Sequence, residues 1–170
     1  MKKATFLFAF VLACNIVVAQ GYFIKFDGID GESKNAAHRG WSDIFSFNQA
    51  LGIDPGATTA TGATRTRRGT GSLGKIISMV KRVDKSSPKI MEALTTGRII
   101  PSVELELSVS GNEKYRYELQ NVAVTRYMVM GEGSELPMEE ITISFERQKV
   151  IYTEFDDTGR RRGTIETEYN

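Results

Sequence analysis

One short segment of this chain carries the signals of an α-helix, and the segments on both sides of it favour strands. Ser87 can cap the first turn with its hydroxyl, and Pro88 follows at a position where a missing N–H group costs nothing. The apolar residues of the segment fall on one stripe: Ile90, Met91 and Leu94. Gly97 then supplies a left-handed stop. The pattern predicts a mainly β chain with one short helix, about Pro88 to Thr96.

The clearest strand pattern follows this helix. Residues 103–109 and 115–119 alternate apolar and polar side chains, and Gly111-Asn112 is the turn between them. The other strands expected in this half are 122–130, 141–152 and 163–169. Strands joined by turns, with no internal repeat, indicate an antiparallel sandwich or barrel in a single domain.

Short motifs precede and follow the helix in a specific order. In chain order they are a strand at 22–26, Gly31-Glu32-Ser33, His38, strands at 41–47 and 75–81, the capped helix, and a strand that begins at Pro101. This order resembles the Hcp family, the haemolysin-coregulated tube proteins of bacterial type VI secretion. The resemblance covers roughly Tyr22 to Tyr169.

The resemblance implies both a fold and a function. The fold would be an antiparallel β-barrel of two sheets, with the helix packed on its outside. Subunits would join edge to edge into a hexameric ring with a wide pore, and rings would stack into a tube. The protein would be a structural carrier and not an enzyme. Its partners would be copies of itself, effector proteins in the pore, and spike and sheath proteins.

Composition argues against several other classes of function. With 22 basic and 21 acidic residues, the chain lacks the positive excess of a dedicated nucleic-acid binder. His38 is the only histidine and Cys14 the only cysteine, so neither a metal site nor a cofactor is expected. We expect His38 to make a structural hydrogen bond. Glu104 and Glu106 share one strand face, which we expect to face solvent.

A glycine-rich motif at 69–74 satisfies G-x-G-x-x-G, and Lys75 follows it as in a P-loop. However, Ile76 stands where a P-loop needs a Ser or Thr hydroxyl to hold magnesium. The next residues also favour a strand, whereas a phosphate loop must open a helix. No nucleotide binding is therefore expected.

The N-terminus has the pattern of an export signal. Two lysines at 2–3 precede an apolar run that begins at Ala4, and Ala19 fits small-residue cleavage before the following glutamine. Asn15 interrupts the run, so a stable membrane span is not expected. The chain would then divide into a secretory signal peptide, residues 1–19, and one Hcp-like barrel domain, residues 20–170. The mature protein would be exported, to the periplasm or beyond.

Two alternatives concern this export signal. Val11-Leu12-Ala13 before Cys14 loosely resembles a lipobox, which would make the protein a lipoprotein. The tube-forming relatives implied by the resemblance assemble in the cytoplasm and carry no signal peptide. An exported copy could therefore be a ring protein with a separate periplasmic or extracellular binding role, outside the secretion tube.

The segment from Ile53 to Ser72 is rich in Gly, Thr and Ala and is long for a loop in a compact domain. In the family that the chain resembles, this loop meets a neighbouring ring. Arg65, Arg67 and Arg68 are then candidate ring-stacking residues, since arginines pair well with carboxylates of another subunit. A solvated surface loop without a partner remains the alternative.

The strand around residues 43–50 separates two kinds of side chain. Phe45 and Phe47 alternate with Ser46 and Asn48, so the two pairs should point to opposite faces. We expect the aromatic pair in the core. Ser46 and Asn48 are candidate pore-facing residues by the resemblance, with ordinary solvent exposure as the alternative.

Overall fold

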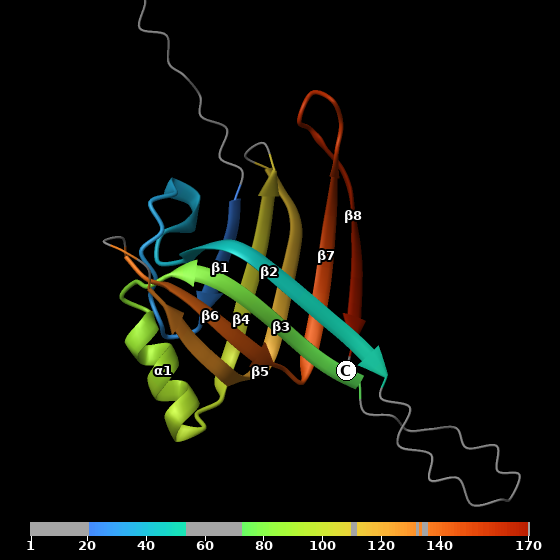
Figure 1. The fold of residues 1–170 in the computed structure, drawn as a ribbon. Helices are drawn as coiled ribbons and strands as arrows, with labels where there is room; N and C mark the ends of the chain where they lie inside the picture. The colour runs from blue at the N-terminus through green and yellow to red at the C-terminus, as the bar shows by residue number, and fades with distance from the viewer. Residues whose placement is uncertain (1–20, 54–72, 110–111, 132, 134–135, 170) are drawn as a thin grey trace, which may run out of the picture.

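The computed structural model describes residues 21–53, 73–109, 112–131, 133 and 136–169 (Figure 1). The elements are β1 (Gly21–Phe26), a 3-10 turn (Ala36–His38), β2 (Ser42–Ile53), β3 (Leu73–Arg82), α1 (Ser87–Thr96), β4 (Ile100–Val109), β5 (Asn112–Met130), β6 (Met138–Ser144), β7 (Arg147–Phe155) and β8 (Arg161–Tyr169). Within these residues the fold is mainly β and antiparallel, with one α-helix, as predicted.

The long strand β5 closes the strands into a barrel. The hydrogen-bonded order is β4-β1-β2-β3-β6-β5-β7-β8, with a further pairing between β4 and β5. The first half of β5 pairs with β4 and β7, and its second half, from Ala123, pairs with β6. The described strands therefore form one continuous sheet that closes on itself, and the two sheets expected from the resemblance share β5.

Asn121 marks the place where β5 changes partners. Its φ of 53° lies in the left-handed region that residues other than glycine rarely adopt. The Asn121 side chain donates a hydrogen bond of 2.6 Å to Glu146, which lies between β6 and β7. This local turn of the backbone lets one strand serve both sides of the barrel.

The inner faces of the strands form the core. Its fully buried members come from most of the strands and from the helix: Ile24, Phe26, Ile77, Met79, Ile90, Ile100, Leu105, Leu119, Ile141 and Ile143. Burial of this apolar surface is the main driving force for closing the barrel.

Helix α1 packs against β5 (Figure 1). Ile90 and Ala93 are buried, and Gly97 ends the helix with a φ of 67°, as predicted. Met91, which was expected on the buried stripe, is 43% exposed. The expectation that Ser87 caps the helix is also wrong, because the helix begins at Ser87 and the preceding residue makes no side-chain cap bond.

The glycine of the Gly31-Glu32-Ser33 motif is required by close packing. A Cβ atom on Gly31 would lie 2.3 Å from the carbonyl oxygen of Trp41, so no other residue fits without movement. Ser33 donates a hydrogen bond of 2.6 Å to Asp43 on β2. The motif therefore holds the connection between β1 and β2 against the barrel.

Candidate functional site

The outer face of β2, β3, β6 and the second half of β5 forms one regular surface of the described part of the chain. Strand register aligns its side chains in three rows: Ser46, Val80, Glu140 and Met128; Asn48, Ser78, Thr142 and Arg126; and Ala50, Ile76, Ser144 and Ala123. None of these residues is buried. The face is made of small or neutral side chains, apart from one acid and one base.

A shallow hollow of about 530 Å³ runs along this face, beside Ser46, Asn48 and Ser78. Ser78 and Thr142 share a hydrogen bond of 3.1 Å between their hydroxyls. Glu140 is the one charged side chain among the residues that line the hollow, and the others are hydroxyl, amide, aromatic or aliphatic side chains. The lining of the hollow is therefore mostly uncharged.

Ser46 and Asn48 point away from the core, as predicted, whereas the prediction for the aromatic pair is half wrong. Phe47 is partly buried and packs on the core, but Phe45 is 56% exposed. A β-bulge between Ile44 and Ser46 adds a residue to β2, so Ile44 takes the inward position. Phe45 instead lies beneath the guanidinium of Arg82, 5.7 Å from the ring centre.

The four strands that carry this face leave two edges open in the described part of the chain. Beyond Ile44, β2 pairs only with β3. From Val124 to Met130, β5 pairs only with β6. Such edges present unpaired backbone N–H and C=O groups, which a strand of another chain can satisfy. Strand β8 is a third open edge, since it pairs only with β7.

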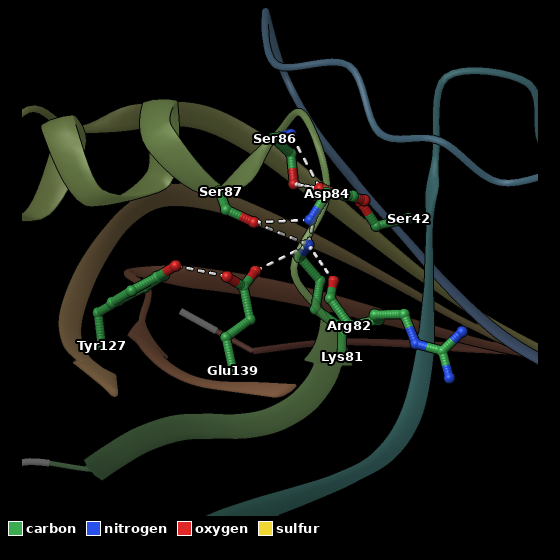
Figure 2. Close-up of polar contacts among 8 residues, drawn as sticks. All are labelled: Ser42, Lys81, Arg82, Asp84, Ser86, Ser87, Tyr127 and Glu139. Atoms are coloured by element: carbon green, nitrogen blue, oxygen red, sulfur yellow. Dashed lines mark hydrogen bonds and ion pairs between the residues drawn. The ribbon is translucent and has the colours of Figure 1, made fainter. Parts of the chain in front are cut away.

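A buried polar network holds one end of this sheet to α1 (Figure 2). The side chains of Lys81 on β3 and Glu139 on β6 are fully buried and form an ion pair of 2.7 Å. Lys81 also contacts Asp84 at 2.8 Å, and Ser42 of β2 donates a bond of 2.7 Å to the same carboxylate. Tyr127 of β5 donates its hydroxyl hydrogen to Glu139. The network therefore joins four strands to the start of the helix.

The network also explains the helix start. Asp84 accepts the backbone N–H of Ser86, and Ser87 accepts the backbone N–H of Asp84. Burial by itself raises the pKa of Asp84, but hydrogen bonds from Lys81, Ser86 and Ser42 outweigh it and lower the pKa below its ordinary value. Burial, together with the hydrogen bond to Glu139, raises the pKa of Tyr127.

His38 belongs to a second polar cluster, on the β1–β4–β5 side. Its Nε2 atom lies 2.8 Å from Glu106, and its ring stacks on Phe23 at 3.8 Å. The structural hydrogen bond predicted for His38 is present. The expectation that Glu106 faces solvent is wrong: it is 6% exposed, and Arg116 bonds both to it and to Glu113. Glu104 remains partly exposed.

The predicted stacking residues Arg65, Arg67 and Arg68 lie outside the described residues, as do Cys14 and the predicted signal peptide, residues 1–19. Lys75 and Ile76 lie within β3, so the glycine-rich motif leads into a strand, as predicted, and not into a helix that could hold phosphate. No cluster of three or more potential metal ligands occurs among the residues that were described. In that same part of the chain, no helix is long and apolar enough to span a bilayer.

Comparison with known proteins gives one consistent result. A family model described as "Type VI secretion system effector, Hcp" matches residues 23–152. "Protein hcp1" of Pseudomonas aeruginosa is 28% identical over 151 residues, which cover 86% of this chain and 91% of that protein. A solved structure of a type six secretion system protein has a TM-score of 0.72 at 27% identity, covering 86% of this chain and 92% of the other. A type VI secretion effector of Yersinia pestis shares the fold, with a TM-score of 0.70 at 24% identity over 88% of this chain and 98% of that one.

Proposed function

Because the chain belongs to the Hcp family of type VI secretion proteins, we propose that it is a ring-forming tube subunit whose hexameric pore carries effector proteins. The family membership confirms the resemblance drawn from the order of the motifs. The observation that carries the proposal is the four-stranded sheet with a smooth outer face and two open edges. The protein acts as a conduit and performs no chemistry.

Strand direction supports closure of a ring through these edges. Neighbouring strands are antiparallel across β2, β3, β6 and β5, so β2 and β5 run in opposite directions. If the copies in a ring are related by rotation about an axis parallel to the strands, each strand keeps its direction in every copy. The β5 edge of one copy then lies antiparallel to the β2 edge of the next, and each edge satisfies the backbone groups of the other.

In this ring the outer face of the sheet lines the pore. Ser46 and Asn48 face the lumen, together with the neutral residues of the same rows. Small, uncharged side chains offer few strong contacts, so cargo can enter and leave. Glu140 and Arg126 supply one charge of each sign per subunit, which leaves the wall close to neutral.

The oligomeric state of the purified protein tests this proposal. Light scattering should give the mass of a hexamer, and dilution into the micromolar range should not dissociate it. A monomer at that concentration would contradict ring formation and favour an isolated binding protein.

Stacking of rings through residues 53–72 is a further part of the proposal. This segment joins the end of β2 to the start of β3, whereas Glu32 and Asp43 lie near the opposite end of the same strand pair. Rings stacked in one direction bring the segment of one ring toward this acidic end of the next. Arg65, Arg67 and Arg68 then pair with these carboxylates.

The N-terminal residues favour an exported form of this ring, either periplasmic or secreted. If the signal peptide is used, mass spectrometry of the protein from its native host should find Gln20, or its pyroglutamate, at the N-terminus. An intact Met1 in a purely cytoplasmic pool would contradict export. A diacylglyceryl group on Cys14 would establish the lipoprotein alternative instead.

A further inference from the structure

A fourth row of side chains, at one end of the same outer face, differs from the three rows described above. Arg82 on β3 pairs with Met138 on β6, and Met138 pairs with Met130 on β5. Figure 2 shows the Arg82 side chain pointing away from the buried network. At the β2 edge, the bulge places Phe45 beneath the guanidinium of Arg82. These four residues, called the terminal row, cross the sheet from its β2 edge to its β5 edge.

The terminal row is apolar apart from its one arginine, and it is open to solvent. Phe45 and Met130 are 56% and 43% exposed, and Met138 is partly exposed. Leu136, two residues before Met138, is 64% exposed and lines a hollow of about 430 Å³ together with Phe45 and Arg82. Contiguous exposed apolar side chains within a polar surface mark a site of interaction with another molecule.

Methionine supplies much of this apolar surface. Met128 lies on the same face of β5 as Met130, because side chains two positions apart on a strand share a face. Methionine side chains are unbranched and polarizable, so they adapt to apolar partners of different shapes. The surface therefore suits partners whose sequences vary.

Edge-to-edge ring closure leaves the terminal row uncovered. A neighbouring copy that pairs along the β2 or β5 edge continues the sheet and does not lie over its outer face. Because the copies are equivalent, the terminal rows of all of them lie at the same mouth of the pore. A molecule inside the pore can therefore contact several terminal rows at once.

Two guanidinium groups border this apolar surface. Arg82 lies within the terminal row, and Arg126 contacts the sulfur of Met128 at 3.9 Å. Within the part of the chain that the structure describes, neither arginine forms an ion pair. A partner with carboxylates beside its apolar side chains is therefore complementary to both parts of the surface.

We propose that the terminal row, together with Met128 and Leu136, forms a collar at one mouth of the pore that binds cargo proteins. The cargo binds through an amphipathic segment in which apolar side chains lie beside carboxylates. This inference rests on the ring proposed above and names the kind of cargo surface that the lumen recognises. The rest of the wall, with Ser46 and Asn48, offers few contacts and lets the cargo pass.

Binding of a model peptide tests the collar. The probe is a short dye-labelled peptide of leucine and glutamate, and fluorescence anisotropy measures its affinity for the purified hexamer. Met130→Gln should weaken binding by about tenfold or more, because it removes apolar contact surface in every subunit. Ile165→Gln is the matched control on β8, where Ile165 is 67% exposed, and it should change the affinity less than about twofold.

A second peptide tests the contribution of the guanidinium groups. In this peptide glutamine replaces glutamate, so the apolar side chains remain and the carboxylates are lost. Arg126→Gln should weaken binding of the first peptide and leave binding of the second unchanged. Equal effects on both peptides would overturn the pairing of cargo carboxylates with Arg126.

Photo-cross-linking locates the bound peptide. When photo-leucine replaces leucine in the probe, mass spectrometry of the irradiated hexamer should find adducts on residues of the collar. A hexamer that binds no peptide, or whose affinity is unchanged by Met130→Gln, would overturn the collar and leave the ring intact. Adducts confined to β7 and β8 would overturn it as well. Failure of the unsubstituted protein to form a hexamer would overturn the ring itself and the collar with it.

Discussion

The two faces of the sheet formed by β2, β3, β6 and β5 differ sharply, although they alternate along the same strands. The inner face carries Ile77 and Ile143, which are fully buried. The outer face carries Asn48, Ser78 and Thr142, which are at least partly exposed. The inner-face residues therefore stabilise the fold by packing in the core, whereas the outer-face residues next to them in the sequence are not constrained by core packing. A protein built in this way can vary the side chains of its outer face without destabilising its barrel.

The inner face also holds a fully buried ion pair. Lys81 and Glu139 are a fully buried pair near α1, whereas Lys89 and Glu92 form an exposed pair on the helix itself. Removing one member of a buried pair leaves a charge without a partner in a medium of low dielectric constant. The exposed pair has water as an alternative partner.

The largest expected effect follows from this difference. Lys81→Met should lower the free energy of unfolding by about 3–5 kcal/mol, because Glu139 is left buried and unpaired. Chemical denaturation measures the change, with Lys89→Met as the matched control. The control should leave the denaturation midpoint nearly unchanged. Equal effects of the two substitutions would show that the Lys81 network does not anchor the helix.

Ile76 and Ile77 are adjacent on β3 but lie on opposite faces of the sheet. The same substitution at each position therefore compares what the two faces contribute to stability. Ile77→Ala removes a fully buried side chain and should cost roughly 2–5 kcal/mol of unfolding free energy. Ile76 is 42% exposed on the outer face, and Ile76→Ala should change the stability by at most about 0.5 kcal/mol. Similar losses at the two positions would contradict the assignment of inner and outer faces.

Acid should weaken the network on the inner side. The pKa of Asp84 is lowered in the folded protein, so its carboxylate stabilises the fold fully above its ordinary pKa of 3.8. That contribution is lost as the pH falls through 3.8 toward the lower folded value. Asp84→Asn should therefore reduce the loss of stability below about pH 4, as measured by urea unfolding at several pH values. If Asp84→Asn loses stability at low pH as steeply as the unsubstituted protein, Asp84 is not the group that causes this loss.

The smallest effect concerns ring stacking, which involves neither face. Replacing Arg65, Arg67 and Arg68 with glutamate should leave single hexamers without stacks, seen by negative-stain microscopy. Added salt should have the same effect on the unsubstituted protein, since exposed charges are screened over roughly 10 Å at 0.1 M. Stacks that persist in the triple variant would show that other residues join the rings.

Much of the fold is predictable from local patterns. The period of two in β4 and β5 and the Pro88 and Gly97 signals of α1 are short-range features, and both kinds of element are found. The bulge at Phe45 is not predictable in this way, because one inserted residue reverses the alternation without any change in composition. The 19-residue length of β5 lets it pair on both sides of the barrel, and this length cannot be inferred from local periodicity either.

The candidate site was predicted only in part for a related reason. Ser46 and Asn48 lie on the expected face because they fall beyond the bulge and alternate regularly with Phe47. The rows that complete the face come from strands distant in the sequence, as does the pairing of Lys81 with Glu139. Such pairings depend on strand register, which the sequence of one strand does not contain.

Electron cryo-microscopy of the purified protein is the most direct measurement of the central claim, that the outer face of the sheet lines the pore of a ring. The account predicts particles with six-fold symmetry, in which Ser46 and Asn48 of every subunit face an open lumen. Subunits that remain separate would contradict it. So would a ring whose lumen is lined by β7 and β8 while Ser46 and Asn48 face outward.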